Sequence, residues 1–121
     1  HGSTKVNVRR RDIHYVKLNV NTPGKEIEWF TSIKYYTIYF EVSFEEIKED
    51  LQEVEDGKKN IDEISTTLYK STLNADNEDD KEVNGKYLCE KPGTLIFKWD
   101  NMHSIFRSKD ITYRIGFVNN K

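Results

Sequence analysis

Apolar and polar residues alternate with a period of two along most of this chain. In the stretch 36–44, Ile38, Phe40 and Val42 fall on one face, whereas Tyr39 falls on the other. This alternation is typical of β-strands that bury one face. A similar pattern, or a similar content of β-branched and aromatic residues, marks the ranges 15–20, 27–31, 61–73, 83–89, 94–99 and 111–118. We therefore predict seven or eight short strands.

Turn signals separate these stretches. The sequences at 21–24 and 91–93 each contain Pro-Gly, in which Pro fixes φ and Gly accepts a positive φ. The acidic range 45–60 has only a thin apolar stripe at helical spacing, which predicts a charged loop or a short helical insertion, and 74–81 reads as an exposed loop. Short strands without a long helix predict an all-β fold, an antiparallel β-sandwich of the jelly-roll type.

The length and composition indicate one domain. The chain has 121 residues, near the commonest size of a single domain. We interpret residues 1–3 as a tag remnant and 4–121 as the β-sandwich domain. Cys89 is the single cysteine, which excludes an intrachain disulfide and, with no clustered His, argues against a structural metal site. This cysteine usage suits a reducing, cytoplasmic compartment.

Basic charge gathers near the start of the chain. The range 4–17 contains Lys5, Arg9, Arg10, Arg11 and Lys17 against one acidic residue, although the whole chain has a net charge of −2. The arginine run has two readings: it contacts phosphates, or it is a solvated edge that deters aggregation between strands. The net charge and the lack of aromatics among the arginines argue against a nucleic-acid partner.

Catalytic chemistry is not visible in the sequence. There are three histidines, His1, His14 and His103, and no nucleophile elbow, phosphate-binding glycine loop or metal-ligand spacing. Most carboxylates fall in expected loops, where solvation is more common than a raised pKa. We therefore predict a protein that is not an enzyme, with no catalytic residue, cofactor, metal or small-molecule substrate.

The densest polar pattern connects two alternating strands at 99–109. Asp100, Asn101 and Ser104 carry side chains that bond neighbouring backbone groups and fix a structured turn. Arg107 and Lys109 follow at the edge of this turn, where they are candidates for a surface presented to a partner. The alternative reading is that the polar residues only hold the turn.

The residues at 92–104, with Arg107-Ser108-Lys109 and the strand at 111–113, resemble the C-terminal signature of the Golgi-dynamics (GOLD) domain. That signature runs as a Gly-containing turn, an apolar strand, an aromatic-Asp-Asn, a Ser, an Arg-Ser-Lys and a Tyr-bearing strand. Upstream, 28–30 and 36–42 resemble the family's Trp-x-Phe and Asp-Ile-x-Phe elements, with Thr37 in place of the usual Asp. The resemblance covers nearly the whole chain, although the acidic range 45–60 departs from the short form of the pattern.

The resemblance implies a β-sandwich that serves protein–protein interaction in Golgi dynamics, vesicle traffic and lipid transfer. Because the family's transmembrane cargo receptors carry a disulfide in this domain, a single cysteine suggests the cytosolic branch, as in patellin-like lipid-transfer proteins and Golgi acyl-CoA-binding adaptors. We therefore expect a cytoplasmic protein, peripheral on Golgi or vesicle membranes. The leading hypothesis is an adaptor module that recruits a protein partner.

Two other hypotheses stay open at this point. In the first, the domain binds anionic lipid headgroups through a basic patch, for which the candidate residues are Arg9, Arg10, Arg11, Lys17, Arg107 and Lys109. In the second, the domain is a carbohydrate-binding sandwich, which needs Trp29 or Trp99 as an exposed platform. Both tryptophans share faces with other apolar residues, so we expect them to be buried.

Overall fold

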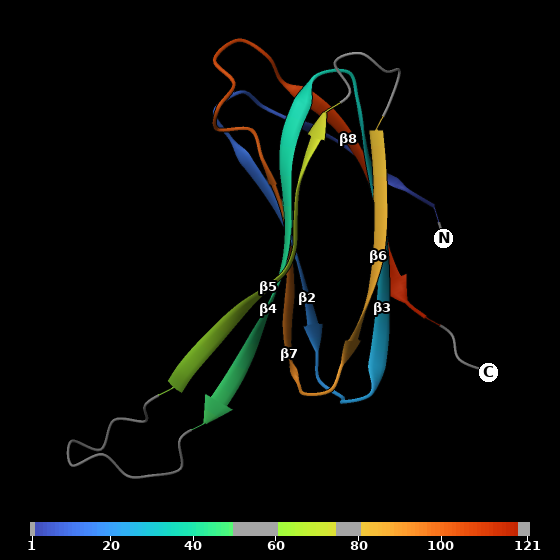
Figure 1. Cartoon of the computed structure of the whole chain (residues 1–121), viewed down its shortest axis with the longest axis vertical. Helices are drawn as coiled ribbons and strands as arrows, with labels where there is room; N and C mark the ends of the chain where they lie inside the picture. The colour runs from blue at the N-terminus through green and yellow to red at the C-terminus, as the bar shows by residue number, and fades with distance from the viewer. Residues whose placement is uncertain (1, 50–60, 75–80, 119–121) are drawn as a thin grey trace.

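Two four-stranded antiparallel sheets pack face to face in this protein (Figure 1). The computed structural model describes residues 2–49, 61–74 and 81–118. The strand order is β1-β8-β3-β6 in one sheet and β2-β7-β4-β5 in the other, which confirms the predicted jelly-roll type of sandwich. The strands are β1 (Thr4–Val8), β2 (Ile13–Val20), β3 (Lys25–Lys34), β4 (Thr37–Glu49), β5 (Ile61–Asn74), β6 (Lys81–Cys89), β7 (Gly93–Asp100) and β8 (Lys109–Phe117).

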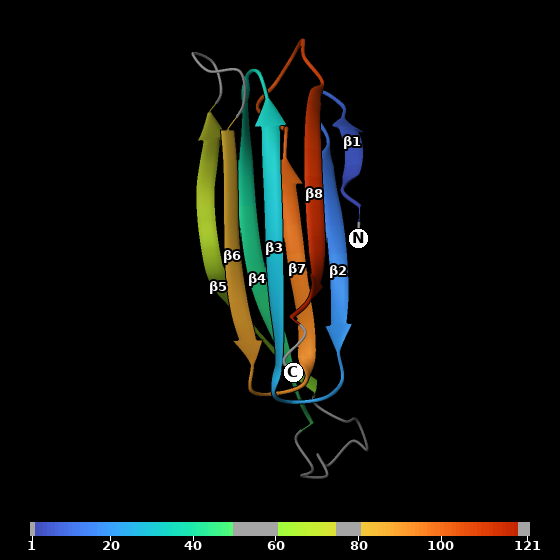
Figure 2. The same cartoon turned by 90° about the vertical axis from the view of Figure 1, so that its right-hand side faces the viewer.

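The strand topology places the connections between strands at the two ends of the sandwich in turn. Apart from β4 and β5, strands that follow one another in the chain belong to different sheets. The β1–β2, β3–β4 and β7–β8 connections therefore lie at one end, whereas the β2–β3 and β6–β7 connections lie at the other (Figures 1 and 2). Three segments that are far apart in the sequence are in this way brought to one end.

The core fills the space between the two sheets. Alternate residues of β4 and β7 are buried, and the large side chains of Phe40, Phe97 and Trp99 are at most 1% exposed. The one polar atom of the Trp99 ring is satisfied inside the core, because its Nε1 donates to Thr31 Oγ1 at 2.9 Å and Thr31 Oγ1 donates to Thr112 O at 3.0 Å. The predicted alternation therefore marks the buried face correctly.

A glycine makes room for the second tryptophan of this core. A Cβ atom on Gly85 of β6 would lie 2.5 Å from the Trp29 ring, so only glycine fits opposite this side chain. Trp29 is 6% exposed and packs edge-on against Phe97, with ring centroids 5.7 Å apart.

The structure corrects the prediction at two places. Residues 45–49, predicted as part of a loop or short helix, continue β4, because their backbone pairs with β5 from Glu45↔Ser65 to Glu49↔Ile61. The rest of the predicted insertion, 50–60, and most of the predicted loop at 74–81 lie outside the described residues. The sequence pattern also missed β1, a short edge strand that pairs with β8. In the part of the chain that is described, no helix has the length and apolarity needed to span a membrane.

Candidate functional site

The β1–β2, β3–β4 and β7–β8 connections form one structural unit, which we call the tip and define as residues 9–12, 35–36 and 101–108. Backbone hydrogen bonds join its first and third segments: Arg11 N donates to Asn101 O at 3.2 Å, and Asn101 N donates to Asp12 O at 2.9 Å. Arg107 links the third segment to the second, because its Nη1 donates to the Tyr36 hydroxyl at 2.6 Å.

Asn101 is the centre of the tip. Its side chain is fully buried, and its Nδ2 lies 3.0–3.1 Å from the carbonyl oxygens of Val8, Arg9 and Arg107. Its Oδ1 accepts a hydrogen bond from Lys109 Nζ at 2.8 Å. One side chain thus satisfies backbone groups from two connections, which a buried backbone requires.

Lys109 has a different role from the predicted one. It is 4% exposed, and its Nζ donates to Thr37 O at 2.9 Å as well as to Asn101 Oδ1. A buried ammonium that is held by two oxygens is not available to a partner. The prediction that Lys109 contacts a partner or a lipid is therefore wrong, and this residue belongs to the support of the tip.

Asp100 and Ser104 shape the third segment of the tip. Asp100 Oδ1 accepts a hydrogen bond from Met102 N at 2.8 Å, which is an Asx turn. Ser104 Oγ donates to Arg107 O at 2.9 Å and accepts from Arg107 N at 3.1 Å. These bonds fix the backbone on both sides of the residues that the segment exposes.

Four of the predicted contact residues, Arg9, Arg10, Arg11 and Arg107, meet at the tip, and all four are exposed. Two of them are oriented by the third segment: Arg11 Nη1 donates to Met102 O at 2.8 Å and Arg10 Nη1 to Ile105 O at 3.4 Å. Arg107 lies over the Tyr36 ring, 4.5 Å from its centroid.

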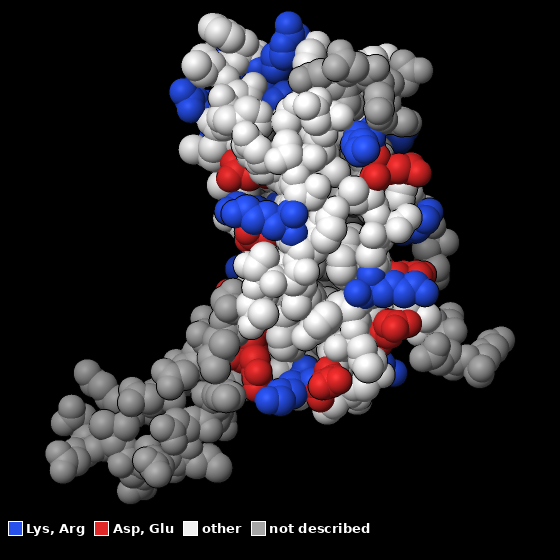
Figure 3. Space-filling view, in the orientation of Figure 1, with Lys and Arg blue, Asp and Glu red and all other residues white. Residues whose placement is uncertain are grey.

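Lys17, the remaining predicted contact residue, lies apart from this group. It is an exposed residue in the middle of β2, paired with Ile96 of β7. Figure 3 shows Lys and Arg side chains around the upper end of the molecule, where the tip lies.

The tip also exposes apolar side chains, which the sequence reasoning did not select. Phe106 is 83% exposed and Ile105 is 53% exposed, and Met102 is also exposed on the same segment. Tyr35 and Tyr36 add two exposed aromatic rings from the β3–β4 connection. The available signal was an adjacent Ile-Phe pair inside a mainly polar connection, where no strand face accounts for it.

Backbone strain marks the tip as well. Among the described residues, the non-glycine positions with positive φ are Arg11 (59°), Tyr35 (63°) and Tyr36 (66°), and all three belong to the tip. The left-handed region costs an ordinary residue about 1–2 kcal/mol. Such strain concentrates at functional sites, where the side chain matters more than the ease of the turn.

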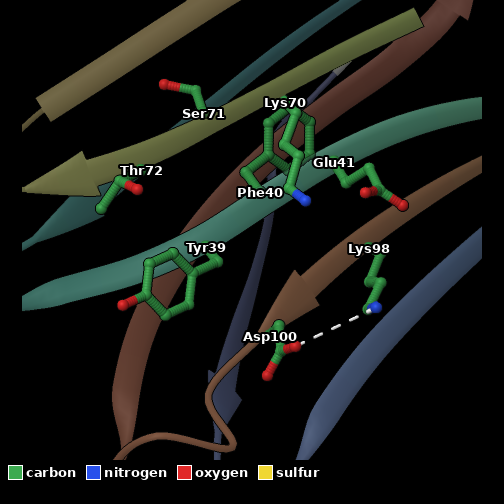
Figure 4. Close-up of a pocket in the computed structure, with 8 residues that line it drawn as sticks. All are labelled: Tyr39, Phe40, Glu41, Lys70, Ser71, Thr72, Lys98 and Asp100. Atoms are coloured by element: carbon green, nitrogen blue, oxygen red, sulfur yellow. Dashed lines mark ion pairs between the residues drawn. The ribbon is translucent and has the colours of Figure 1, made fainter. Parts of the chain in front are cut away.

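A polar groove adjoins the tip on the outer face of the β2-β7-β4-β5 sheet (Figure 4). Its volume is about 470 Å³. Tyr39 connects the groove to the tip, because its ring lies 4.8 Å from the ring of His103. The lining residues are Tyr39, Phe40, Glu41, Lys70, Ser71, Thr72, Lys98 and Asp100.

Other reactive side chains in the described structure do not assemble into a second site. His14 stacks in the sandwich against Trp99 and Tyr113, with centroid distances of 5.6 and 6.0 Å. Cys89 is buried, and this burial raises the pKa of its thiol. Within the described ranges, no group of three or more His, Cys, Asp and Glu residues is arranged to hold a metal ion. Trp29 and Trp99, the platforms that the carbohydrate hypothesis needs, are both buried.

Comparison with known proteins assigns this chain to no family. A scan against protein-family models finds no match, and a search of curated proteins finds none either. Among solved structures, the chain is similar to the CBM22-1 xylan-binding domain of Xyn10C from Paenibacillus barcinonensis, with 12% sequence identity and a TM-score of 0.43. That alignment covers 87% of this chain and 65% of that domain, so the chain spans less than two thirds of it. We draw no functional conclusion from a similarity this low.

Proposed function

We propose that this protein is a peripheral membrane-binding module and that its tip docks on an anionic lipid surface. The observation that carries the proposal is the position of Phe106, 83% exposed, in a tip that also exposes four arginines. An exposed apolar pair bordered by basic residues has the two properties of a membrane interface: an apolar layer beneath a layer of phosphates.

The apolar part supplies attachment that salt does not screen. Full burial of a phenylalanine side chain contributes about 1.5–3 kcal/mol. Ile105 adds apolar surface beside it. The hydrogen bonds of Ser104 and Asp100 hold this segment in shape before it meets a surface, so that little conformational entropy is lost on binding.

The basic part supplies attraction to phosphate. Each Arg near an anionic membrane contributes about 1 kcal/mol. The guanidinium group suits this task because its planar donors match the oxygens of a phosphate group. Neither part is sufficient alone, since single weak anchors give only marginal membrane binding. The two signals together support reversible attachment.

Vesicle sedimentation tests the apolar part of this proposal. The native chain should sediment with vesicles of phosphatidylcholine and phosphatidylserine and stay in solution with phosphatidylcholine alone. Phe106→Ala should weaken binding roughly tenfold or more, because it removes the inserted ring. Phe117→Ala is the matched control. Phe117 is also exposed, but it is the last residue of β8 and lies about 27 Å along this strand from Lys109, the residue next to the tip.

Charge reversal tests the basic part. Arg9→Glu is the variant of choice, because the hydrogen bond described for Arg9 uses its carbonyl oxygen and leaves the side chain exposed. It should weaken binding roughly tenfold, whereas Lys25→Glu at the opposite end should have a small effect. Equal binding of the native chain to anionic and neutral vesicles, or equal effects of the two reversals, would contradict the proposal.

The adaptor role is a second candidate, which the sheet edges favour. β6 ends its sheet, so its outer edge pairs with no strand that the structure describes and offers backbone groups to a partner strand. Membership of the GOLD family, a non-enzymatic role and a place on the cytoplasmic side of Golgi or vesicle membranes stay proposals with it. Capture of one defined partner by the native chain and by Phe106→Ala, but not by Leu88→Glu in β6, would support it. Capture that is insensitive to Leu88→Glu would count against it.

A further inference from the structure

The groove beside the tip is lined by side chains from two neighbouring cross-strand rows. Glu41 of β4 pairs with Lys98 of β7 on one side and with Lys70 of β5 on the other. In the next row, Tyr39 pairs with Asp100 and with Thr72. Figure 4 shows these side chains around one hollow, with Phe40 behind them. Membrane docking through the tip leaves this groove without a role.

Oppositely charged side chains face one another across the groove, but they do not fill it with close salt bridges. Within the described residues, Glu41 forms no ion pair with either lysine, and Lys98 reaches Asp100 only at 4.0 Å. Directly opposed residues on adjacent strands are close enough for a salt bridge to form. The charged groups thus surround the hollow of about 470 Å³ and present both donors and acceptors to it.

The charge balance of the groove selects against a charged ligand. Two lysines and two carboxylates give it no net charge, so an anion meets Glu41 and Asp100, and a cation meets Lys70 and Lys98. A neutral hydroxyl group suits this lining, because one oxygen both donates to a carboxylate and accepts from an ammonium. Several hydroxyl groups on one ligand are needed to meet all four charged groups.

Aromatic rings border the same face. Tyr39 is 45% exposed at the end of the groove towards the tip, and Tyr15, which pairs with Lys98, is 49% exposed. An aromatic ring combines an apolar face with a polar edge, and its face packs against the C–H groups of a flat ring. A ring that carries hydroxyl groups around its edge and C–H groups on its faces matches this arrangement.

We infer that the groove binds a hydroxyl-rich ring, either a neutral sugar or an inositol. Glu41, Lys70 and Lys98 bond its hydroxyl groups, and Tyr39 packs against its face. Two sources offer this chemistry: the headgroup of a membrane lipid, or a free sugar in solution. The lipid source rests on the proposed function, because the groove then lies next to a tip that is docked on the headgroups.

The first experiment compares two vesicles of equal charge. Phosphatidylinositol and phosphatidylserine, at the same fraction in phosphatidylcholine, differ in the headgroup ring and not in net charge. The native chain should prefer phosphatidylinositol by about tenfold, and Glu41→Gln should abolish this preference. Glu28→Gln, which removes an exposed carboxylate from the outer face of the opposite sheet, should leave the preference intact. If the lost negative charge alone mattered, Glu41→Gln and Glu28→Gln would both bind both kinds of vesicle more tightly, with no change in the preference between them.

The second experiment uses free ligands. Addition of myo-inositol or of neutral disaccharides to the isotopically labelled chain should shift the amide resonances of residues 39–41, 70–72 and 98–100, and Glu41→Gln should remove these shifts. If such shifts occur but neither vesicle binds, the groove inference holds with a free sugar as its source and the proposed function fails. If both vesicles bind equally and no free ligand shifts these resonances, the inference is overturned while the proposed function stands. A phosphatidylinositol preference that survives in Glu41→Gln also overturns it.

Discussion

At the scale of single residues, Asn101 contributes more to the stability of the tip than any of its arginines does. Its two N–H donors serve three carbonyl oxygens, and its Oδ1 holds the ammonium of the buried Lys109. We expect Asn101→Ala to lower the free energy of unfolding by about 3 kcal/mol, because it leaves buried carbonyl groups and a buried charge short of partners. Urea denaturation followed by tryptophan fluorescence measures this change.

Two further variants show whether the loss of stability comes from the buried hydrogen bonds of Asn101. Asn19→Ala is the control, since Asn19 is exposed and bonds one hydroxyl, that of Thr94, so its loss should cost less than about 1 kcal/mol. Asn101→Asp keeps an oxygen for Lys109 but turns a donor into a carboxylate that faces three carbonyl groups. It should be as destabilised as the alanine variant. A loss below 1 kcal/mol in Asn101→Ala would show that water replaces these bonds.

How far single residues could be predicted depends on how local their bonds are. The turn-forming side chains of Asp100 and Ser104 act within a few residues, so the sequence was enough to select them. Lys109 was misread because its partners, Thr37 and Asn101, come together only in the fold. Ile105 and Phe106 escaped notice because alternation reports on strand faces and is silent about an apolar pair in a connection.

At the scale of elements, the β3–β4 connection exposes two aromatic rings at positions whose positive φ lowers the stability of the fold. Tyr35 has a φ of 63° and is half exposed. Asn accepts this conformation more easily than Tyr does. We expect Tyr35→Asn to raise the free energy of unfolding by up to about 1 kcal/mol and to weaken binding to anionic vesicles. Urea midpoints and vesicle sedimentation give the two values.

Tyr15→Asn provides the comparison for this element. Tyr15 has a similar exposure but lies in β2, so the same substitution should destabilise the chain by up to about 1 kcal/mol through the lower strand propensity of Asn. Opposite signs for the two substitutions would locate the strain in the connection. A loss of stability in Tyr35→Asn comparable with that in Tyr15→Asn would mean that packing of the ring outweighs the backbone cost.

Elements were predictable where they face the core. Seven strands follow from alternation or from β-branched and aromatic content, because each of them presents apolar residues to the opposite sheet. The signal fails at 45–49, where the β4–β5 ladder continues past the region in which the sheets face one another (Figure 1). It fails again at β1, a five-residue edge strand with few apolar positions. Pairing of this kind depends on the neighbouring strand, which alternation within one segment does not reveal.

At the scale of the whole molecule, the two ends of the sandwich differ in chemistry. The tip combines four arginines with exposed apolar residues, although Arg10 and Ile105 are separated by 95 positions in the chain. No local pattern predicts this meeting, which depends on the jelly-roll order of the strands. The opposite end has two connections with proline and an ion pair, Lys91–Glu46, at 3.3 Å. We therefore expect the molecule to bind membranes with the tip towards the lipid.

Site-specific labelling tests this orientation, and Cys89 allows it in the native background. Cys89 is fully buried, and because burial raises the pKa of its thiol, less of it is present as the reactive thiolate at neutral pH. An environment-sensitive fluorophore should therefore attach to an introduced cysteine, which mass spectrometry verifies. With Met102→Cys in the tip, anionic vesicles should shift the emission to shorter wavelengths, and with Thr22→Cys at the opposite end they should not. A response at Thr22→Cys equal to or larger than that at Met102→Cys would mean that the tip does not meet the lipid, whatever the affinity of the chain for vesicles.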